Sequence, residues 1–345
     1  MSHAEIAVLL LVVVGCLSAF LVWRAIPIGR QLAIVNRSGV PAPRIGGIAI
    51  AIAFLFGIAL SFAMPINRFP IEVERIGLIC MAGAAIVLFM LVDDAIGLAP
   101  KTKLSIQIAV SAVMVLPRFR NSMHGIAIDQ FNAPMVGQIR LALPIAVVVT
   151  ILWFVATMNA INWIDGIDGL APTVTLVAAV ILFLHTYFWP RQDPQFTISI
   201  LPLVLGAAVA GFLPFNWFPA RITLGDAGAN FLGLTIAAIS IVGGAKLATA
   251  LLVLGLPLLD LVWVTTARAI RGQPIAAGDK SHLHHRLLAR GWSVGKIVGF
   301  VGGVSLFFGV LSLLLPNKEA KLGAMLALGV VLLLTVGRPG FRASS

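Results

Sequence analysis

Aspartate residues occur in this sequence where carboxylates could hold a divalent cation. Asp93 and Asp94 are adjacent and close an apolar run, and Asp226 lies between two glycines. Two like charges at the end of an apolar helix are costly unless a cation compensates them. We therefore predict a cation site built from these carboxylates. A solvated polar turn is the alternative for the pair, and a helix N-cap is the alternative for Asp226.

Four polar residues recur at every third position further along the chain: Asn159, Asn162, Asp165 and Asp168. A glycine follows each of the two aspartates and breaks a helix there, so we expect both carboxylates on a turn at the membrane boundary. Capping a helix end requires one such residue, and four exceed that need. The pattern indicates side chains that orient a polar substrate.

The segment around Asp226 carries further features of a ligand site. Asn216 precedes it, and Gly225 and Gly228 flank the aspartate. Glycines let the backbone approach a ligand closely, and a helix that begins directly afterwards offers its first N–H groups to an anion. Together with the other clusters, this segment favours phosphate binding over simple capping.

Histidine and arginine side chains gather between residues 279 and 290. If Asp279 caps a short helix, then His282, His285, Arg286 and Arg290 share one face of it. These donors suit a diphosphate or a sugar. A zinc site is an alternative, although no cysteine lies nearby, and a solvated loop is another.

Two further charged residues have open interpretations. Lys103 follows the aspartate pair, with Gln107 one turn later, and its ammonium group could bind phosphate or extend to the membrane interface. Asp260 lies inside an apolar run, where it is either functional or paired with Arg268 or Arg271. Carboxylates for Mg²⁺, amides for orientation and cations for phosphate oxygens are together what phosphoryl transfer requires.

The elements that position these residues must lie in a lipid bilayer. The chain has 345 residues, of which 60% are hydrophobic and 11% are charged. A soluble domain has roughly 25% charged residues. We predict an all-α, polytopic transmembrane helix bundle that forms a single integral membrane domain over residues 1–345. Cys16 and Cys80 lie in apolar runs and are interpreted as small buried hydrophobic residues.

About ten or eleven segments are apolar enough to cross the membrane as helices. The first is interpreted as a retained helix and not as a cleaved signal peptide, because no Lys or Arg precedes it. The fourth and eighth are short for a full crossing. The candidates cover residues 5–23, 45–64, 76–92, 104–116, 141–158, 170–188, 198–215, 231–242, 247–266, 297–315 and 322–336.

The loops between these segments alternate in charge. With the first loop in the cytosol, 15 of the 24 Lys and Arg residues lie on the cytosolic side. The positive-inside rule then places the N-terminus outside and the C-terminus in the cytosol. A random solvated surface would mix glutamate with aspartate, yet all the acids of the cytosolic side are aspartates. They are Asp93, Asp94, Asp165, Asp168, Asp226, Asp260 and Asp279.

Two loops are long enough for structure of their own. The cytosolic loop 268–296 carries the histidine-rich segment, and the outer loop 117–140 is polar enough to form a small surface hairpin. The net charge of +11 is assigned to cytosolic loops that face anionic lipid, so no nucleic-acid partner is expected.

Taken together, the clusters resemble the polyprenyl-phosphate N-acetylhexosamine-1-phosphate transferases of glycosyltransferase family 4, which include the phospho-MurNAc-pentapeptide translocase. Five motifs match in order, from about residue 40 to 290, which is far more specific than any one of them. They cover residues 43–47, 93–107, 159–170, 211–228 and 279–287. The last stretch is similar to the branch that initiates O-antigen and enterobacterial common antigen synthesis, which implies a nucleotide sugar without a peptide as donor.

The resemblance implies a reaction and a cofactor. UDP-N-acetylhexosamine (with N-acetylglucosamine or a deoxy relative as the sugar) and undecaprenyl phosphate would give undecaprenyl-diphosphate-sugar and UMP. This would be the first membrane step of a cell-surface polysaccharide. Mg²⁺, with Mn²⁺ as a substitute, would be bound by Asp226 together with Asp93 or Asp94. One of that pair would alternatively orient or deprotonate the lipid phosphate, and direct in-line attack is favoured over an aspartyl-phosphate intermediate.

The resemblance also implies roles for the remaining polar residues. Asp165, Asp168 and His284 are expected in the catalytic centre, where the two aspartates and Asn162 would position the nucleotide and its diphosphate. Lysine, histidine and arginine side chains would neutralise charge on the transferring phosphoryl group and hold the sugar. The expected substrate-binding residues are Lys103, Asn159, Asn162, Asn216, His282, His285 and Arg286.

The implied location is the bacterial inner (cytoplasmic) membrane, with the active site facing the cytosol and a homodimer as an open alternative to a monomer. A membrane transporter or lipid flippase is the alternative class of function. Such proteins often have inverted repeats and sites near the bilayer centre. Here the polar residues gather at one surface and no repeat is evident, which favours the transferase.

Overall fold

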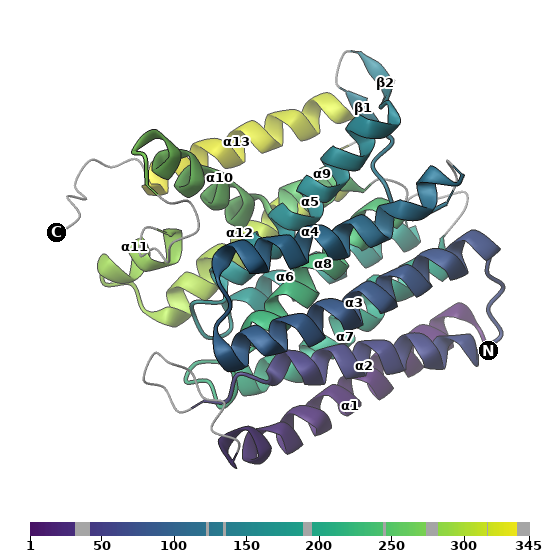
Figure 1. Cartoon of the computed structure of the whole chain (residues 1–345), viewed down its shortest axis with the longest axis horizontal. Helices are drawn as coiled ribbons and strands as arrows, with labels where there is room; N and C mark the ends of the chain where they lie inside the picture. The colour runs from purple at the N-terminus through teal and green to yellow at the C-terminus, as the bar shows by residue number, and fades with distance from the viewer. Residues whose placement is uncertain are drawn as a thin grey trace.

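The protein is a bundle of α-helices with one short β-hairpin at its edge (Figure 1). This computed structural model describes residues 1–31, 42–121, 124–133, 136–188, 195–243, 246–273, 282–315 and 317–336. The prediction of an all-α polytopic membrane protein is confirmed.

The helices follow one another along the chain, and most of the connections between them are short. They are α1 (His3–Gln31), α2 (Gly46–Phe62), α3 (Pro70–Ile96), α4 (Pro100–Val115), the 3₁₀ turn η1 (Leu116–Phe119), α5 (Leu143–Ile164), α6 (Leu170–Phe188), α7 (Phe196–Asn216), α8 (Gly225–Val242), α9 (Leu247–Val253), α10 (Gly255–Ile270), α11 (Leu283–Ala289), α12 (Val294–Leu314) and α13 (Lys318–Val336). The strands β1 (Gln130–Ala133) and β2 (Gly137–Arg140) pair antiparallel. This pairing confirms the small hairpin predicted within the outer loop 117–140.

Every predicted apolar segment lies on a helix, but fewer helices than expected meet the requirements for a crossing. Among the described residues, eight are long and apolar enough. A ninth results if α9 and α10, which are bent by 76° at their junction, form one broken span. Helix α2 has 17 residues, at the short end for a bilayer. Within the described residues, eight or nine helices thus meet both criteria, beside the ten or eleven crossings that the sequence predicts.

The fourth and eighth segments are longer than the apolar pattern indicated. Helix α4 begins at Pro100 and continues through η1, and α8 begins at Gly225. In both cases the first turn carries charged residues, Lys103 in α4 and Asp226 in α8. Hydropathy alone excludes these turns, although they are helical and long enough to extend each helix to a full crossing.

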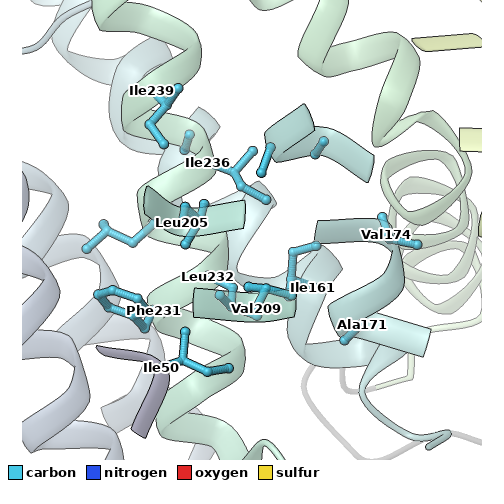
Figure 2. Close-up of a cluster of buried hydrophobic side chains, with 14 of the residues drawn as sticks. Ile50, Ile161, Ala171, Val174, Leu205, Val209, Phe231, Leu232, Ile236 and Ile239 are labelled. Atoms are coloured by element: carbon cyan, nitrogen blue, oxygen red, sulfur yellow. The ribbon is translucent and has the colours of Figure 1, made fainter. Parts of the chain in front are cut away.

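Helix α8 lies at the centre of the bundle and is almost completely buried. It packs against α2, α3 and α5, and Figure 2 shows its apolar side chains among those of its neighbours. The labelled side chains are Ile50, Ile161, Ala171, Val174, Leu205, Val209, Phe231, Leu232, Ile236 and Ile239. Because lipid is as apolar as these side chains, close van der Waals packing and not water exclusion holds such helices together.

Glycine allows the closest of these approaches. A Cβ atom on Gly233 of α8 would lie 2.5 Å from the Cα atom of Met158 on α5. Gly47 at the start of α2 and Gly228 at the start of α8 are equally close, since a Cβ on Gly47 would lie 2.1 Å from the Gly228 Cα. Small residues at such contacts let helix backbones meet in membranes.

The helices alternate in direction, so their connections fall at two ends of the bundle (Figure 1). The α3–α4, α5–α6 and α7–α8 connections lie at one end together with α11. The N-terminus and the hairpin lie at the other end. The predicted chemistry-bearing residues are therefore at a common end, opposite to the N-terminus.

We expect Gly233→Ala to destabilise the bundle by about 1–3 kcal/mol, because its new methyl group meets the backbone of Met158 and nothing flexible can yield. Thermal unfolding in detergent measures the effect. Gly77→Ala in α3 is the matched control, since a Cβ there meets no atom within 4 Å. Equal melting temperatures for the two variants would contradict the close packing of α8 on α5.

Candidate active site

Asp94 joins the end of α3 to the beginning of α8. Its two carboxylate oxygens accept hydrogen bonds from the backbone N–H groups of Asp226 and Ala227, both at 3.0 Å. Gly225 makes this approach possible, because it has a φ of +76° and a Cβ there would lie 2.8 Å from the Asp94 carboxylate. A carboxylate at a helix N-terminus satisfies free amides and opposes the positive end of the helix dipole. Asp94 therefore acts as the cap of α8.

Asp93 and Asp226 share a cation. The Lys103 ammonium lies 2.5 Å from an oxygen of Asp93 and 2.7 Å from an oxygen of Asp226. The second oxygen of Asp93 accepts the N–H of Leu98 at 2.7 Å, in the turn that follows α3. The prediction that the aspartate pair closes the third helix is confirmed, because that helix ends at Ile96.

Arg44 is a member of this site that the sequence interpretation did not identify as a site residue. Its guanidinium lies 2.9 Å from Asp226 and 3.1 Å from Asp94. Three carboxylates therefore face two cations, and the Asp93 and Asp94 side chains are only 2% and 1% exposed. Removing one partner of such a buried pair costs about 3–5 kcal/mol, since it leaves a charge without compensation.

The backbone around Arg44 explains how it reaches the carboxylates. The amides of Gly46 and Gly47 donate to the carbonyls of Thr223 and Leu224 at 3.0 and 2.9 Å. These hydrogen bonds hold the start of α2 against the backbone that precedes α8. A basic residue two positions before paired glycines is the signal that could have identified Arg44.

A chain of buried amides links three helices beneath the carboxylates. Gln107 of α4 donates to Asn230 of α8 at 2.7 Å and accepts from Asn159 of α5 at 2.8 Å. Asn230 in turn donates to the backbone carbonyl of Asp226 at 2.8 Å. In this structure the predicted substrate-binding residue Asn159 is thus a link in this chain, which fixes the first turn of α8.

The turn between α5 and α6 holds Asp165 and Asp168, as predicted. Asn216 ties this turn to the α7–α8 connection, because its oxygen accepts the N–H of Gly169 and its nitrogen donates to Ile222, both at 2.9 Å. Asp168 accepts the N–H of Ala220 at 3.0 Å. The polar atoms of Asn216 are therefore used within the protein, and the side chain is 2% exposed.

Asp165 lies close enough to the carboxylate cluster to interact with it electrostatically. Burial raises the pKa of Asp165 well above its usual range, and the negative charge of Asp226 raises it further. Asn162, one turn earlier on α5, is partly exposed at the same end. The second predicted cluster therefore lies near the first.

Asp260 holds α11 in place. Its carboxylate lies 3.0 Å from Nδ1 of His282, accepts the N–H of Leu283 at 3.0 Å and accepts from Arg286 at 2.9 Å. The expected common face of the histidine helix is thus turned partly inward, since His282 and Arg286 bond to Asp260. These hydrogen-bonding partners of Asp260 lie in α11 or directly before it. The sequence had instead suggested an ion pair with Arg268 or Arg271. Asp279, the expected cap, lies outside the described residues.

His284 connects α11 to the α5–α6 turn. Its ring packs on Gly166, where a Cβ would lie 2.6 Å from Nε2, and neither ring nitrogen has a hydrogen-bond partner in the described part of the chain. Burial, together with the charges of His285 and His282, lowers the pKa of His284 to about 3. His284 is therefore neutral at physiological pH, not the cation that we expected, and its buried nitrogens are available to a ligand.

The geometry brings the carboxylates together without forming a preassembled metal cage. No group of three or more His, Cys, Asp or Glu side chains in the described ranges is arranged to hold a metal ion. Lys103 and Arg44 lie among the carboxylates instead. Mg²⁺ commonly uses only one or two carboxylates together with substrate phosphates, so Asp93 and Asp226 fit such a site.

We expect Asp260→Asn to speed amide hydrogen exchange in α11 by about 10- to 100-fold, because hydrogen bonds to a charged partner are worth about 1.5–3 kcal/mol. Exchange followed by mass spectrometry measures this local opening. Asp129→Asn, at a partly buried ion pair with Arg118 at the other end, should leave exchange in α11 unchanged, because Arg118 is not part of that helix. Unaltered exchange in the Asp260 variant would show that α11 is held by other contacts.

Known proteins share much of this sequence. The family model described as glycosyl transferase family 4 matches residues 76–244. A Bacillus subtilis (strain 168) protein named probable undecaprenyl-phosphate N-acetylglucosaminyl 1-phosphate transferase is 34% identical over 76% of this chain and 72% of its own length. The decaprenyl-phosphate N-acetylglucosaminephosphotransferase of Mycobacterium tuberculosis (strain H37Rv) is 31% identical over 87% of this chain and 80% of its own length.

A third relative belongs to the other branch of the resemblance. The phospho-N-acetylmuramoyl-pentapeptide-transferase of Staphylococcus saprophyticus is 30% identical over 79% of this chain and 84% of its own length. The matched region of the family model contains the aspartate pair of α3, the α5–α6 turn and the first turn of α8. The chain is a member of glycosyl transferase family 4, the family of the polyprenyl-phosphate N-acetylhexosamine-1-phosphate transferases.

Proposed function

We propose that the protein transfers N-acetylhexosamine-1-phosphate from a UDP-sugar to undecaprenyl phosphate, giving undecaprenyl-diphosphate-sugar and UMP. The observation that carries this proposal is the pair Asp93 and Asp226, which face one cation at the end of the bundle where the α5–α6 turn and α11 also meet. The names of the relatives, which act on undecaprenyl or decaprenyl phosphate, support the same reaction class.

We place Mg²⁺, or Mn²⁺ in its stead, at Asp93 and Asp226. Both oxygens of Asp94 accept backbone amides of α8, which leaves Asp93 as the better partner for Asp226. When bound, the ion would offset the negative charge of the donor phosphates and the charge that develops during transfer. The side chain of Lys103, which is 32% exposed, would then turn from the carboxylates to a phosphate oxygen.

In the proposed step, an oxygen of the lipid phosphate attacks the phosphorus that carries the sugar. The new P–O bond forms as the bond to the UMP oxygen breaks, and UMP leaves with the electron pair. A phosphate nucleophile is already ionised near neutral pH, so positioning and charge stabilisation matter more than a strong base. Neutral His284 would donate a hydrogen bond to the transferring group from its position on Gly166.

The turn residues Asn162, Asp165 and Asp168 would position the nucleotide and its diphosphate. His285, which is partly exposed beside His284, would contact the sugar. His282 and Arg286 would act together with Asp260 by holding this helix over the turn. We propose the cytosolic face of the bacterial inner membrane for this site, N-acetylglucosamine or a deoxy relative as the sugar, and initiation of a cell-surface polysaccharide as the outcome.

Asp226→Asn should lower turnover by at least roughly 10²- to 10³-fold, because the amide cannot replace the carboxylate charge opposite the phosphates. UMP release from UDP-N-acetylglucosamine and undecaprenyl phosphate at millimolar Mg²⁺ measures it, with chelator and Mn²⁺ arms. Asp129→Asn, at the other end of the bundle, serves as the control. Normal activity in the Asp226 variant would remove this metal site. A wild-type protein that releases no UMP from any UDP-sugar would favour a transporter or flippase.

His284→Ala should reduce kcat by about 10²-fold, on the order expected for one preorganised donor. Gly166→Ala should have a similar effect without removing the ring, because its Cβ would meet Nε2 of His284. His124→Ala, at the hairpin end, should retain wild-type turnover. If turnover is unchanged in both site variants, α11 has only a structural function.

A further inference from the structure

A cavity of about 1050 Å³ lies at the end of the bundle opposite the active site. It is enclosed by the segment before and within the hairpin, by α5, and by the first turns of α9 and α13. Pockets that bind drug-sized ligands have volumes of roughly 300–1,000 Å³. This space is therefore large enough for a ligand of its own, and no residue of the proposed transferase site lines it.

The cavity has a strong excess of positive charge. Four basic side chains line it, namely Arg75, Arg118, Lys246 and Lys321, whereas Asp129 is the one carboxylate among the described lining residues. That carboxylate is already bonded to Arg118. Basic side chains therefore outnumber carboxylates in the described lining of the cavity.

The two arginines bond to the segment that leads to the hairpin, and the two lysines lie near α9 and α13. Nε of Arg75 donates to the carbonyl of Gly125 at 3.2 Å, which anchors the segment that leads to the hairpin. Lys246 directly precedes α9, and Lys321 lies in the first turn of α13. The lysines thus approach each other from two different helices.

The positive charges of these lysines repel each other. Burial lowers the pKa of Lys246, and the charge of Lys321 lowers it further. The charges of both lysines also act on the ring of His185, which is bonded to Thr249 at 2.7 Å in the same cavity. Bringing like charges together costs free energy, which a bound anion would offset.

The predicted topology makes this charge cluster unexpected. Of the 24 Lys and Arg residues, nine lie on the side that the loop pattern assigns to the outside, and four of these nine line this one cavity. The positive-inside rule disfavours basic residues on that side. Their concentration in one cavity therefore indicates that these basic residues bind a ligand and do not serve to orient the chain in the membrane.

The remaining wall of the cavity is apolar and open to the lipid-facing surface. Leu152 of α5 is 61% exposed and Leu322 of α13 is 44% exposed, and both line the cavity. Val149 and Met325 extend the same wall along α5 and α13. A ligand that combines an anionic group with a hydrocarbon chain matches both parts of this space.

We propose that this cavity binds a lipid whose phosphate-containing headgroup has a net negative charge. The phosphate lies between Lys246 and Lys321, where lysine acts as a point-charge phosphate ligand. The hydrocarbon chain follows the apolar wall formed by Leu152 and Leu322. The site is distinct from the transferase site, whose own cations, Arg44 and Lys103, lie at the other end of the bundle.

The test is native mass spectrometry of the purified full-length protein, delipidated in detergent and titrated with phosphatidylglycerol. We expect one tightly bound lipid and about 30-fold weaker binding in the Lys246→Gln/Lys321→Gln variant, since each basic residue near an anionic lipid contributes about 1 kcal/mol. Lys246→Arg/Lys321→Arg should retain the lipid. The matched control is Arg120→Gln/Arg140→Gln, which removes two exposed charges near the same end but outside the cavity.

Four results would overturn the proposal. Unchanged binding in the glutamine variant would remove the lysines from the site, and equally tight binding of phosphatidylcholine would leave only apolar contact. Complete displacement of the lipid by inorganic phosphate would indicate a site for a free anion. On the unmodified protein, phosphatidylglycerol binding should weaken as salt rises, because salt screens the lysine charges. Binding that is insensitive to salt contradicts the proposal even if the variants do not fold.

Discussion

The position of the candidate active site depends on the hydrogen bonds between the carboxylate of Asp94 and the first amides of α8. The C-terminal end of α3 has a partial negative charge, and two adjacent aspartates there would be unfavourable alone. The N-terminal end of α8 has the opposite partial charge and offers free N–H groups, which Asp94 accepts at 3.0 Å. Arg44 and Lys103 compensate the remaining charge. Two helix ends thereby stabilise each other, and the pair delivers Asp226 next to Asp93.

Five of the aspartates at this end of the bundle make one or both of two kinds of contact, and Asp93 makes both. Asp94, Asp168 and Asp260 accept backbone amides and hold a helix or a turn in place. Asp93 and Asp226 face one shared ammonium group, and this is the arrangement that a divalent ion and phosphates could replace. A short carboxylate serves both purposes, since few rotatable bonds separate it from the backbone. Patterned aspartates therefore indicate an organised polar site, in which several carboxylates have a structural role.

The bundle meets two different demands at its two ends. At the active-site end, small residues such as Gly47 and Gly166 bring the backbone and rings close enough to place side chains from separate helices together. At the other end, basic side chains surround a space that they do not fill. The buried α8 connects the two ends and is held by amide hydrogen bonds at its start and by van der Waals packing along its length.

The sequence by itself determined the lipid-embedded helical class, the polar turns and which residue types could bind a cation and phosphates, because hydropathy, glycine positions and carboxylate spacing are local properties. The sequence pattern underestimated the lengths of α4 and α8, because their charged first turns resemble loops when judged by hydropathy. Only the tertiary structure distinguished the contacts of Asp94 from those of Asp93 and placed Arg44 beside the carboxylates. It also showed that His282 and Arg286 bond to Asp260. Those contacts join residues from different helices, and their distances follow from packing that no local pattern encodes.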